Sequence, residues 1–209
     1  MSTLVPVSLP GREYDIVIGP DVLGEAGTRI AAMGGRRHVT IITDENVARL
    51  HLGALQGSLS AAGLTSEALV LPAGEATKSW PMLEKSVEWL LAQKVERKDV
   101  VIAFGGGVIG DLAGFAAAIL RRGVRFVQIP SSLLAQVDSS VGGKTGINSV
   151  AGKNLIGAFH QPSLVIADTA LLGTLEQRDF LAGYGEVVKY GLLGDAAFFD
   201  WLEANAPSM

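Results

Sequence analysis

The sequence predicts an α/β protein: a Rossmann-like, mainly parallel sheet with flanking helices, followed by the start of an all-helical domain. Short apolar runs rich in β-branched residues alternate with segments of helical periodicity. Polar or glycine-rich turns follow most of the apolar runs. From about residue 176 the helical pattern continues and no further strand is expected. We therefore place an α/β domain at residues 1–175 and the beginning of a helical domain, which the chain does not complete, at residues 176–209.

The expected strands are short apolar runs bounded by turn residues. They lie at residues 4–9, 14–18, 38–43, 68–71, 100–104, 124–129 and 164–167, and the first two form a hairpin. The expected helices begin near cap residues such as Asp21 and Ser79. They lie at residues 21–32, 47–60, 79–93, 109–120, 131–137, 176–190 and 196–203. Because strands and helices alternate, right-handed crossovers make most of the sheet parallel. Residues 141–157, rich in glycine and polar side chains, are expected to form a flexible loop.

Composition narrows the class of protein. The 209 residues allow one large or two small domains, and the net charge of −4 gives no reason to expect a nucleic acid or an anionic membrane as partner. Without cysteine the chain has no disulfide or thiolate metal site, which indicates a reducing, cytoplasmic location. We expect no signal peptide and no membrane span.

The stretch from Val100 to Gly114 is the centre of the chain: an apolar strand, three glycines in a row, then a helix. This order exposes backbone N–H groups and a helix N-terminus to a phosphate. Gly105, Gly107 and Gly110 also satisfy the dinucleotide fingerprint. The alternative interpretation is that these glycines serve tight packing. No acid follows about twenty residues later, so a bound dinucleotide would need its ribose held by an earlier element.

Ligands of open parallel sheets bind at the carboxyl ends of the strands. Polar groups follow successive expected strands here: Asp44, Asn46, Glu75, Lys78, Asp111, Ser131, Ser132 and Asp168. Asp44 can supply the missing ribose contact. Each of these residues could instead be a local helix cap, but polar clusters at four successive strand ends favour a binding site.

The segment Gly142–Gly146 contains Gly-Lys-Thr, yet it is not a nucleotide-triphosphate loop. The Walker pattern requires a glycine where Asp138 stands, and a carboxylate there would repel phosphates. What remains is a loop carrying Lys144, Lys153 and Asn154, which suits a small anion such as a sugar phosphate. Solvated surface lysines are the competing interpretation.

Glu186 and Lys189 are three residues apart and share a face of an expected helix. They form either a surface ion pair or a functional pair, with the carboxylate as metal ligand or base. Glycines at positions 183, 185 and 191 make an ordinary solvent-facing helix less favourable. Arg122 precedes a strand and is either solvated or reaches a neighbouring site.

Three blocks of sequence strongly resemble 3-dehydroquinate synthase: Gly105–Gly114 (GGGVIGDLAG), residues 128–148 (QIPSSLLAQVDSSVGGKTGIN) and residues 153–162 (KNLIGAFHQP), with Gly183–Gly191 extending the match. The resemblance implies conversion of 3-deoxy-D-arabino-heptulosonate 7-phosphate to 3-dehydroquinate and phosphate, in the shikimate pathway. It also implies bound NAD, a divalent metal (zinc or cobalt) and a homodimer.

By the same resemblance, the residues take three roles. The implied NAD contacts are Asp44, Asn46, Glu75, Lys78, Gly106, Gly107, Val108, Asp111, Ser131, Ser132, Lys144, Lys153, Leu171 and Thr174. The implied substrate and phosphate site holds Asp138, Lys144, Lys153, Asn154 and Lys189, and Arg122 reaches it from the neighbouring subunit. Glu186 is the implied metal ligand.

The family's other metal ligands are histidines of a C-terminal helical domain, and none of His38, His51 and His160 has a ligand's context. The chain thus resembles the N-terminal portion of the enzyme and is expected to be inactive alone. Two alternatives stay open: a related cyclase acting on sedoheptulose 7-phosphate, and a non-catalytic NAD-binding module. The lysine-bearing loop argues against a glycerol-dehydrogenase-like enzyme.

Overall fold

The computed structural model describes residues 2–206. Its centre is a seven-stranded sheet in the order β1-β2-β9-β6-β5-β3-β4. The strands are β1 (Thr3–Val7), β2 (Tyr14–Gly19), β3 (His38–Asp44), β4 (Thr65–Leu71), β5 (Val100–Gly105), β6 (Arg125–Pro130) and β9 (Leu164–Asp168). Only β1 runs antiparallel to its neighbour, β2. The predicted mainly parallel α/β fold and its strands are confirmed.

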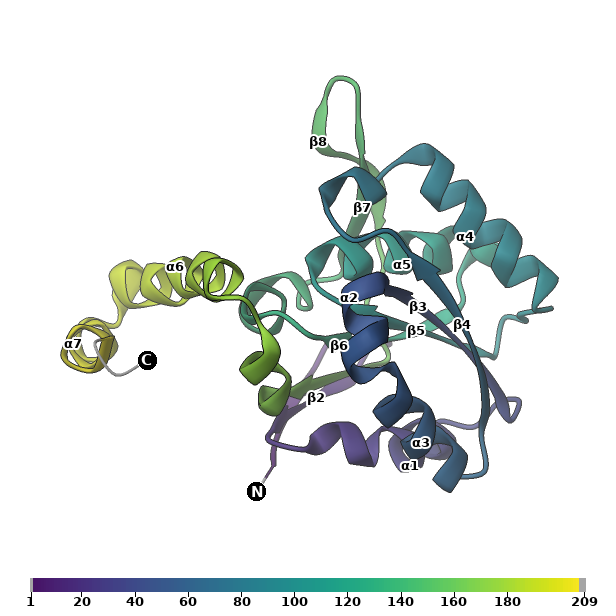
Figure 1. The fold of residues 1–209 in the computed structure, drawn as a ribbon, viewed down its shortest axis with the longest axis horizontal. Coiled ribbons are helices and arrows are strands. Elements are labelled where there is room, and N and C mark those ends of the chain that lie inside the picture. The colour runs from purple at the N-terminus through teal and green to yellow at the C-terminus, as the bar shows by residue number, and fades with distance from the viewer. Residues whose placement is uncertain (1, 207–209) are drawn as a thin grey trace.

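Helices cover both faces of this sheet, as alternating strands and helices require (Figure 1). The helical segments are η1 (Val22–Glu25), α1 (Ala26–Ala32), α2 (Glu45–Val47), η2 (Ala48–Leu52), α3 (Gly53–Ala61), η3 (Glu75–Thr77), α4 (Trp80–Ala92), α5 (Gly107–Ile119), η4 (Leu120–Arg122), η5 (Ala135–Ser139), η6 (Thr169–Thr174), α6 (Gln177–Gly194) and α7 (Ala196–Asn205). Two large apolar cores result, one on each face of the sheet, with a third, small cluster of Tyr14, Ile16 and Val165. Leu55 and Leu59 of α3 pack with Ile41 of β3 on one face, whereas Leu112 of α5 packs with Val101 of β5 on the other.

Asp21 does not cap the first helix, so that prediction was wrong. Its backbone is left-handed at φ 61°, and its side chain makes no capping bond. The buried carboxylate of Asp168, at the end of β9, instead accepts hydrogen bonds from the N–H groups of Asp21 (2.9 Å), Leu23 (2.8 Å) and Ala170 (2.8 Å). Both oxygens of Asp168 are thus engaged, and they stabilise two helix starts at once. Ser79 does precede α4, without a side-chain bond.

Residues 141–157 are not a flexible loop: they contribute most of an antiparallel hairpin of β7 (Lys144–Ser149) and β8 (Gly152–Phe159). A methyl group on Gly157 would overlap the backbone of Thr145, and one on Gly146 would overlap the carbonyl of Ile156. These glycines thus let two strands approach closely. The hairpin packs against α5, where a Cβ on Gly114 would lie 2.5 Å from the Thr145 methyl. The high glycine content of residues 141–157 suggested a flexible loop, but these glycines instead allow close packing of the two strands.

The helices α6 and α7 project from one side of the α/β body (Figure 1). Near its start α6 packs on the segment before η5, since a Cβ on Gly183 would lie 2.5 Å from the backbone nitrogen of Leu134. Further along, the Tyr190 hydroxyl donates to the Val137 carbonyl at 3.1 Å. The two helices were predicted and are confirmed, while the domain division at residue 176 stays a prediction. Within residues 2–206, every helix is too short or too polar to cross a membrane.

Candidate functional site

The carboxyl ends of four strands enclose a cavity of about 290 Å³, which we call the strand-end pocket. Seven residues expected to contact a dinucleotide line it together: Asp44, Asn46, Gly106, Gly107, Val108, Ser131 and Ser132. They come from the end of β3 and the start of α2, from the glycine turn and the first turn of α5, and from the segment just after β6. The parallel topology explains this meeting, because parallel strands present their carboxyl ends at one edge.

The glycine turn serves both ligand access and packing. A Cβ on Gly106 would lie 3.3 Å from the Ser132 hydroxyl, and one on Gly107 would lie 3.0 Å from the Ser139 hydroxyl, so side chains here would crowd the cavity wall. Gly110 packs instead, since a Cβ there would lie 2.8 Å from Oε1 of Gln128. The N-terminus of the thirteen-residue helix α5 thus opens onto the strand-end pocket, an arrangement that suits a phosphate.

Asp44 caps a helix and still has one carboxylate oxygen available to accept a hydrogen bond from a ligand. Its Oδ1 accepts the N–H groups of Asn46 at 2.9 Å and Val47 at 3.1 Å, which starts α2. Both bonds go to the same oxygen, so Oδ2 can accept from a ligand hydroxyl. The two interpretations of Asp44 that the sequence left open are compatible.

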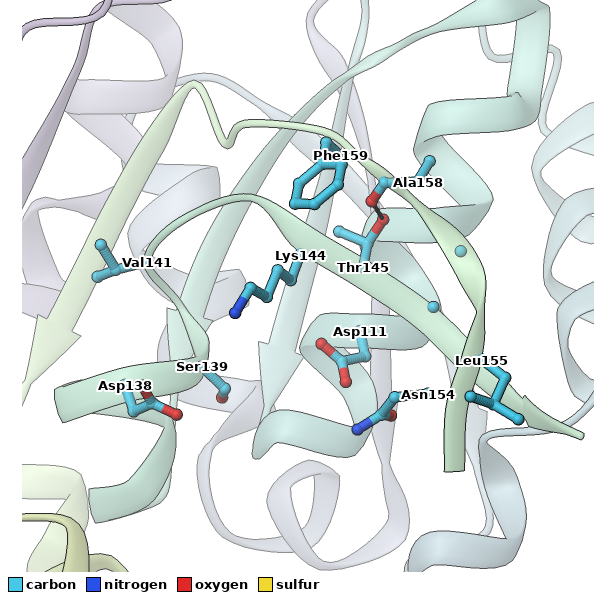
Figure 2. A pocket seen from close by; sticks show the side chains of 12 residues that line it. Asp111, Asp138, Ser139, Val141, Lys144, Thr145, Asn154, Leu155, Ala158 and Phe159 are labelled. Atoms are coloured by element: carbon cyan, nitrogen blue, oxygen red, sulfur yellow. Dashed lines mark hydrogen bonds between the residues drawn. The ribbon is translucent and has the colours of Figure 1, made fainter. Parts of the chain in front are cut away.

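A second, larger cavity of about 560 Å³ lies between α5, η5 and the β7–β8 hairpin, and we call it the hairpin pocket. Figure 2 shows the Lys144 side chain reaching into it from β7, towards Asp138 and Ser139, with Asp111 and Asn154 beside each other on the wall. Asp111 was expected among the dinucleotide contacts, whereas Asp138, Lys144 and Asn154 were expected among the substrate contacts. The two pockets adjoin, because Gly107 of one lies against Ser139 of the other.

Lys78 is buried behind the wall of the hairpin pocket, against two residues that line it. Its Nζ lies 2.5 Å from Oδ2 of Asp111 and also donates to Oδ1 of Asn154. Burial raises the pKa of the Asp111 carboxyl above its usual value, and the hydrogen bond from Lys78 offsets part of that rise. Glu75 is nearby, with Lys153 Nζ at 3.7 Å from its Oε1. Glu75 and Lys78 therefore lie towards the hairpin and not in the strand-end pocket.

The predicted pair on α6 is confirmed as an ion pair between Lys189 and Glu186. Glu186, followed by the negative charge of Asp138, raises the pKa of the Lys189 ammonium group. The bond from the Tyr190 hydroxyl to the Val137 carbonyl holds η5 and α6 together beside this pair. Across residues 2–206 no three His, Cys, Asp or Glu side chains gather as a metal site. Glu186 supplies one candidate ligand, whereas a catalytic zinc normally takes three.

Eight predicted site residues line neither pocket: Glu75, Lys78, Lys153, Glu186 and Lys189, described above, and Leu171, Thr174 and Arg122. Leu171 is buried in the core, and Thr174 bonds to Nε2 of His51 at 2.7 Å, while their neighbour Leu175 lines the strand-end pocket. Arg122 is exposed beyond the C-terminus of α5, about 20 Å along the helix from the glycine turn. It lies at the amino edge of the sheet, before β6, and lines neither pocket of its own chain.

Sequence reasoning assigned no role to several residues that the structure places at the site. Ser139 and Thr145 line the hairpin pocket, and Asn148 bonds to Glu75. All three fall inside the block of residues 128–148 that carries the resemblance, and Thr145 and Asn148 also lie in residues 141–157, which were expected to form a flexible loop. The pairing of the two hairpin strands would have been the signal to find them. Periodicity does not reveal that pairing in so short and glycine-rich a stretch.

Comparison with known proteins agrees with this architecture. Residues 68–182 match the family model described as the N-terminal part of 3-dehydroquinate synthase. The whole chain is 73% identical to the 3-dehydroquinate synthase of Ruegeria sp. (strain TM1040) and 68% identical to that of Jannaschia sp. (strain CCS1). In both cases the chain spans 56% of the relative's length.

Solved structures give the same picture. The 2-epi-5-epi-valiolone synthase of Streptomyces hygroscopicus subsp. jinggangensis 5008, with NAD+ and Zn2+ bound, superposes at a TM-score of 0.86 with 32% identity over 100% of this chain and 56% of that one. A 2-deoxy-scyllo-inosose synthase complexed with carbaglucose-6-phosphate, NAD+ and Co2+ gives 0.81 and 27% identity over 90% of this chain and 50% of that one. A glycerol dehydrogenase from Schizosaccharomyces pombe, at 20% identity, shares the fold. Since the family model matches more than half of the chain, this chain belongs to the 3-dehydroquinate synthase family.

Proposed function

We propose that the protein carrying this chain is a 3-dehydroquinate synthase. It converts 3-deoxy-D-arabino-heptulosonate 7-phosphate to 3-dehydroquinate and phosphate, with NAD and a divalent metal, zinc or cobalt. The observation that carries the proposal is the contact between the two pockets at Gly107 and Ser139. A dinucleotide in the strand-end pocket would thereby lie next to a sugar phosphate in the hairpin pocket. The identity of 65–73% to named synthases favours this over a sedoheptulose 7-phosphate cyclase.

The strand-end pocket fits NAD. Gly106 and Gly107 leave the start of α5 open to the pyrophosphate, Ser131 and Ser132 offer hydroxyls, and Oδ2 of Asp44 accepts from a ribose hydroxyl. Bound NAD would supply a hydride acceptor for a carbinol of the substrate. The chain's part is to hold that carbinol against the cofactor and to exclude water from between them.

The hairpin pocket fits a phosphorylated polyol. Lys144 and the amide of Asn154 provide a cation and a donor for the phosphate, and Asp138 provides an acceptor for sugar hydroxyls. Lys189, on which the charge of Asp138 acts, is a further cation on the η5 side of this pocket. Lys153, 74% exposed, has the reach to add another cation when substrate binds.

Glu186 would hold the metal as one ligand among others. One carboxylate leaves most coordination positions to water, so we expect the 209-residue chain to bind zinc weakly and to release no phosphate from substrate. We propose further that the enzyme is a homodimer in which Arg122 completes the partner's site.

Phosphate release from 3-deoxy-D-arabino-heptulosonate 7-phosphate tests the proposal, with sedoheptulose 7-phosphate as the competing substrate and NAD and zinc supplied. We expect turnover of the first sugar phosphate by the enzyme carrying this chain, and a loss of both metal content and rate in Glu186→Gln. Turnover of sedoheptulose 7-phosphate alone would overturn the substrate assignment. Stoichiometric zinc or steady phosphate release by the isolated chain would contradict its expected inactivity.

The second candidate, an NAD-binding module without catalysis, is favoured for the isolated chain because the strand-end pocket is lined from within residues 44–182, including Asp179 and Ala182 of α6. Calorimetric titration of the 209 residues with NAD separates the outcomes. Binding without phosphate release supports this second candidate for the isolated chain. No binding at all would show that the pocket requires more of the protein than this chain provides.

A further inference from the structure

Asn148, near the end of β7, uses its backbone N–H and both ends of its side-chain amide. Its N–H donates to the Lys78 carbonyl at 2.9 Å, and its Nδ2 donates to Oε1 of Glu75 at 2.7 Å. Its Oδ1 accepts the backbone N–H of Asn154 at 2.9 Å. The partners fix the orientation of the amide, because a carboxylate can only accept and a backbone N–H can only donate.

One of these partners, Asn154, has an unusual backbone. It sits at φ 58°, in the left-handed region that residues other than glycine seldom occupy. Its N–H is held by Asn148, and its own Oδ1 accepts from Lys78. Lys78, Asn148 and Asn154 thus form a closed ring of hydrogen bonds. The ring fixes the position of Asn154 at the wall of the hairpin pocket (Figure 2).

A second partner of Asn148, Glu75, is expected to contact NAD, whereas Asn154 is expected to contact the substrate. Sequence resemblance places Glu75 and Lys78 among the NAD contacts, and Asn154 and Lys153 among the substrate contacts. Asn148 bonds directly to Glu75, Lys78 and Asn154, and Lys153 lies 3.7 Å from the Glu75 oxygen that Asn148 holds. A single half-buried amide therefore links both groups of residues.

We propose that Asn148 is a positioning residue that holds Glu75 and Asn154 in their binding conformations at the same time. The proposal rests on the proposed function for the roles of those two residues. Only an asparagine-like side chain provides a donor for Glu75 and an acceptor for Asn154 in this geometry. Aspartate keeps the acceptor, loses the donor and places a negative charge against Glu75. Alanine loses both bonds.

A ligand-free measurement tests the geometry without reference to function. In Asn148→Ala, the backbone amide of Asn154 should exchange with solvent deuterium at least about ten times faster than in the parent chain. In Asn148→Asp that amide should keep its protection, because the carboxylate still accepts from it. The matched control is Ser149→Ala, whose hydroxyl bonds only within the hairpin turn, to Ala151 and Gly152. Unchanged Asn154 exchange in Asn148→Ala would overturn the proposal.

NAD affinity tests the effect on Glu75. We expect Asn148→Ala and Asn148→Asp each to weaken NAD binding about three- to tenfold, while Ser149→Ala leaves it unchanged. The double variant Asn148→Asp with Glu75→Gln restores a hydrogen bond with the roles exchanged, since glutamine donates and aspartate accepts. It should bind NAD more tightly than Asn148→Asp alone, a recovery that general damage to the hairpin would not give.

A failure of the positioning role of Asn148 can be told apart from a failure of the proposed function. NAD affinity in Asn148→Asp equal to that of the parent, or no recovery in the double variant, would show that Asn148 does not position Glu75. If the parent chain itself bound no NAD, the proposed function would fail for this chain. The positioning role at Asn154 would still be decided by the exchange measurement.

Discussion

Lys78 Nζ and Asp111 Oδ2 lie 2.5 Å apart, in an ion pair that joins the segment after β4 to the first turn of α5. The Lys78 side chain is only 5% exposed and that of Asp111 20%. Asp111 lines the hairpin pocket, one helical turn from Gly107, where that pocket meets the strand-end pocket, and Lys78 supports it from behind. A change at either residue should therefore affect stability and ligand binding together.

Lys78→Met should lower the free energy of unfolding by about 1–3 kcal/mol, because it leaves a mostly buried carboxylate without its cation. The pKa of Asp111, already raised by burial, should rise further once Lys78 no longer lowers it. NAD affinity should fall as well. Urea unfolding and calorimetric titration measure the two effects. Lys85→Met, at an exposed position of α4, is the control and should change neither. Equal behaviour of the two variants would contradict a role for the pair.

Asp44→Ala should weaken NAD binding by about 1–3 kcal/mol through loss of a charge-assisted hydrogen bond to ribose. The same change also removes the cap of α2 and should cost about 0.5–2 kcal/mol of stability. Asp44→Ser separates the effects, since serine can cap the helix and carries no charge. It should keep the thermal midpoint near that of the parent and still bind NAD poorly in calorimetry. Parent-like affinity in Asp44→Ser would rule out the carboxylate as the ribose contact.

Gly157→Ala should destabilise the hairpin, because the new methyl group would overlap the Thr145 backbone across the strand pair. We expect a loss of at least about 1–3 kcal/mol in unfolding free energy, as for overpacked sites. Gly57→Ala is the matched control on α3, where no atom lies within 4 Å of the added Cβ. That change should be neutral or stabilising by up to about 1 kcal/mol. Denaturant melts of both variants decide whether close strand approach is what the hairpin glycines provide.

Asp99 should make stability depend on pH. Burial raises the pKa of its carboxyl, but the hydrogen bonds from Arg36 and from the Glu96 N–H outweigh burial and bring it below the ordinary value of 3.8. A carboxyl with a lowered folded-state pKa contributes stability above its unfolded pKa and loses that contribution as pH falls through the folded pKa. Asp99→Asn should thus unfold more easily than the parent at pH 7, by about 1–3 kcal/mol, and the difference should shrink below about pH 4.

Glu96→Gln is the control for that series. Its partner Arg121 lies at 3.1 Å, and both side chains are well exposed, so the pair should contribute less than about 1 kcal/mol. Chemical denaturation at pH 7, 5 and 3 supplies the comparison. A gap between Asp99→Asn and the parent that stayed constant across this range would show that the Asp99 charge is not the cause.

If the enzyme is the proposed homodimer, Arg122→Ala should reduce turnover while leaving NAD affinity nearly intact. The reason is its location at the amino edge of the sheet, away from both pockets of its own chain. Mixed with Lys144→Ala subunits, it should regain part of the activity, because one site of a mixed dimer receives an intact lysine and an intact arginine. Arg37→Ala, on the same edge, is the control and should stay active. If mixed dimers stay inactive, Arg122 does not act across the interface.

The sequence was sufficient for much of the fold. Short, continuous apolar runs such as β5 are buried on both faces, as is typical of central parallel strands. The order of strands and helices could therefore be predicted from the sequence. The polar residues at the strand ends could also be predicted to form a site, because a parallel sheet gathers the carboxyl ends of its strands at one edge. Asp44, Gly106 and Ser131 meet in the strand-end pocket for that reason.

Local pattern could not decide which polar groups serve long-range contacts. Asp168 resembles any strand-end acid, yet it caps a helix start 147 residues earlier in the chain. Glycines at 146 and 157 resemble a mobile loop until the two strands are paired, when the missing side chains become the condition for close approach. The ring of Lys78, Asn148 and Asn154 likewise exists only after three segments meet. The sequence by itself determined the order of strands and helices and the chemistry at the strand ends. Tertiary structure alone decided which groups pair, because hydrogen bonds and packing depend on distance in space and not along the chain.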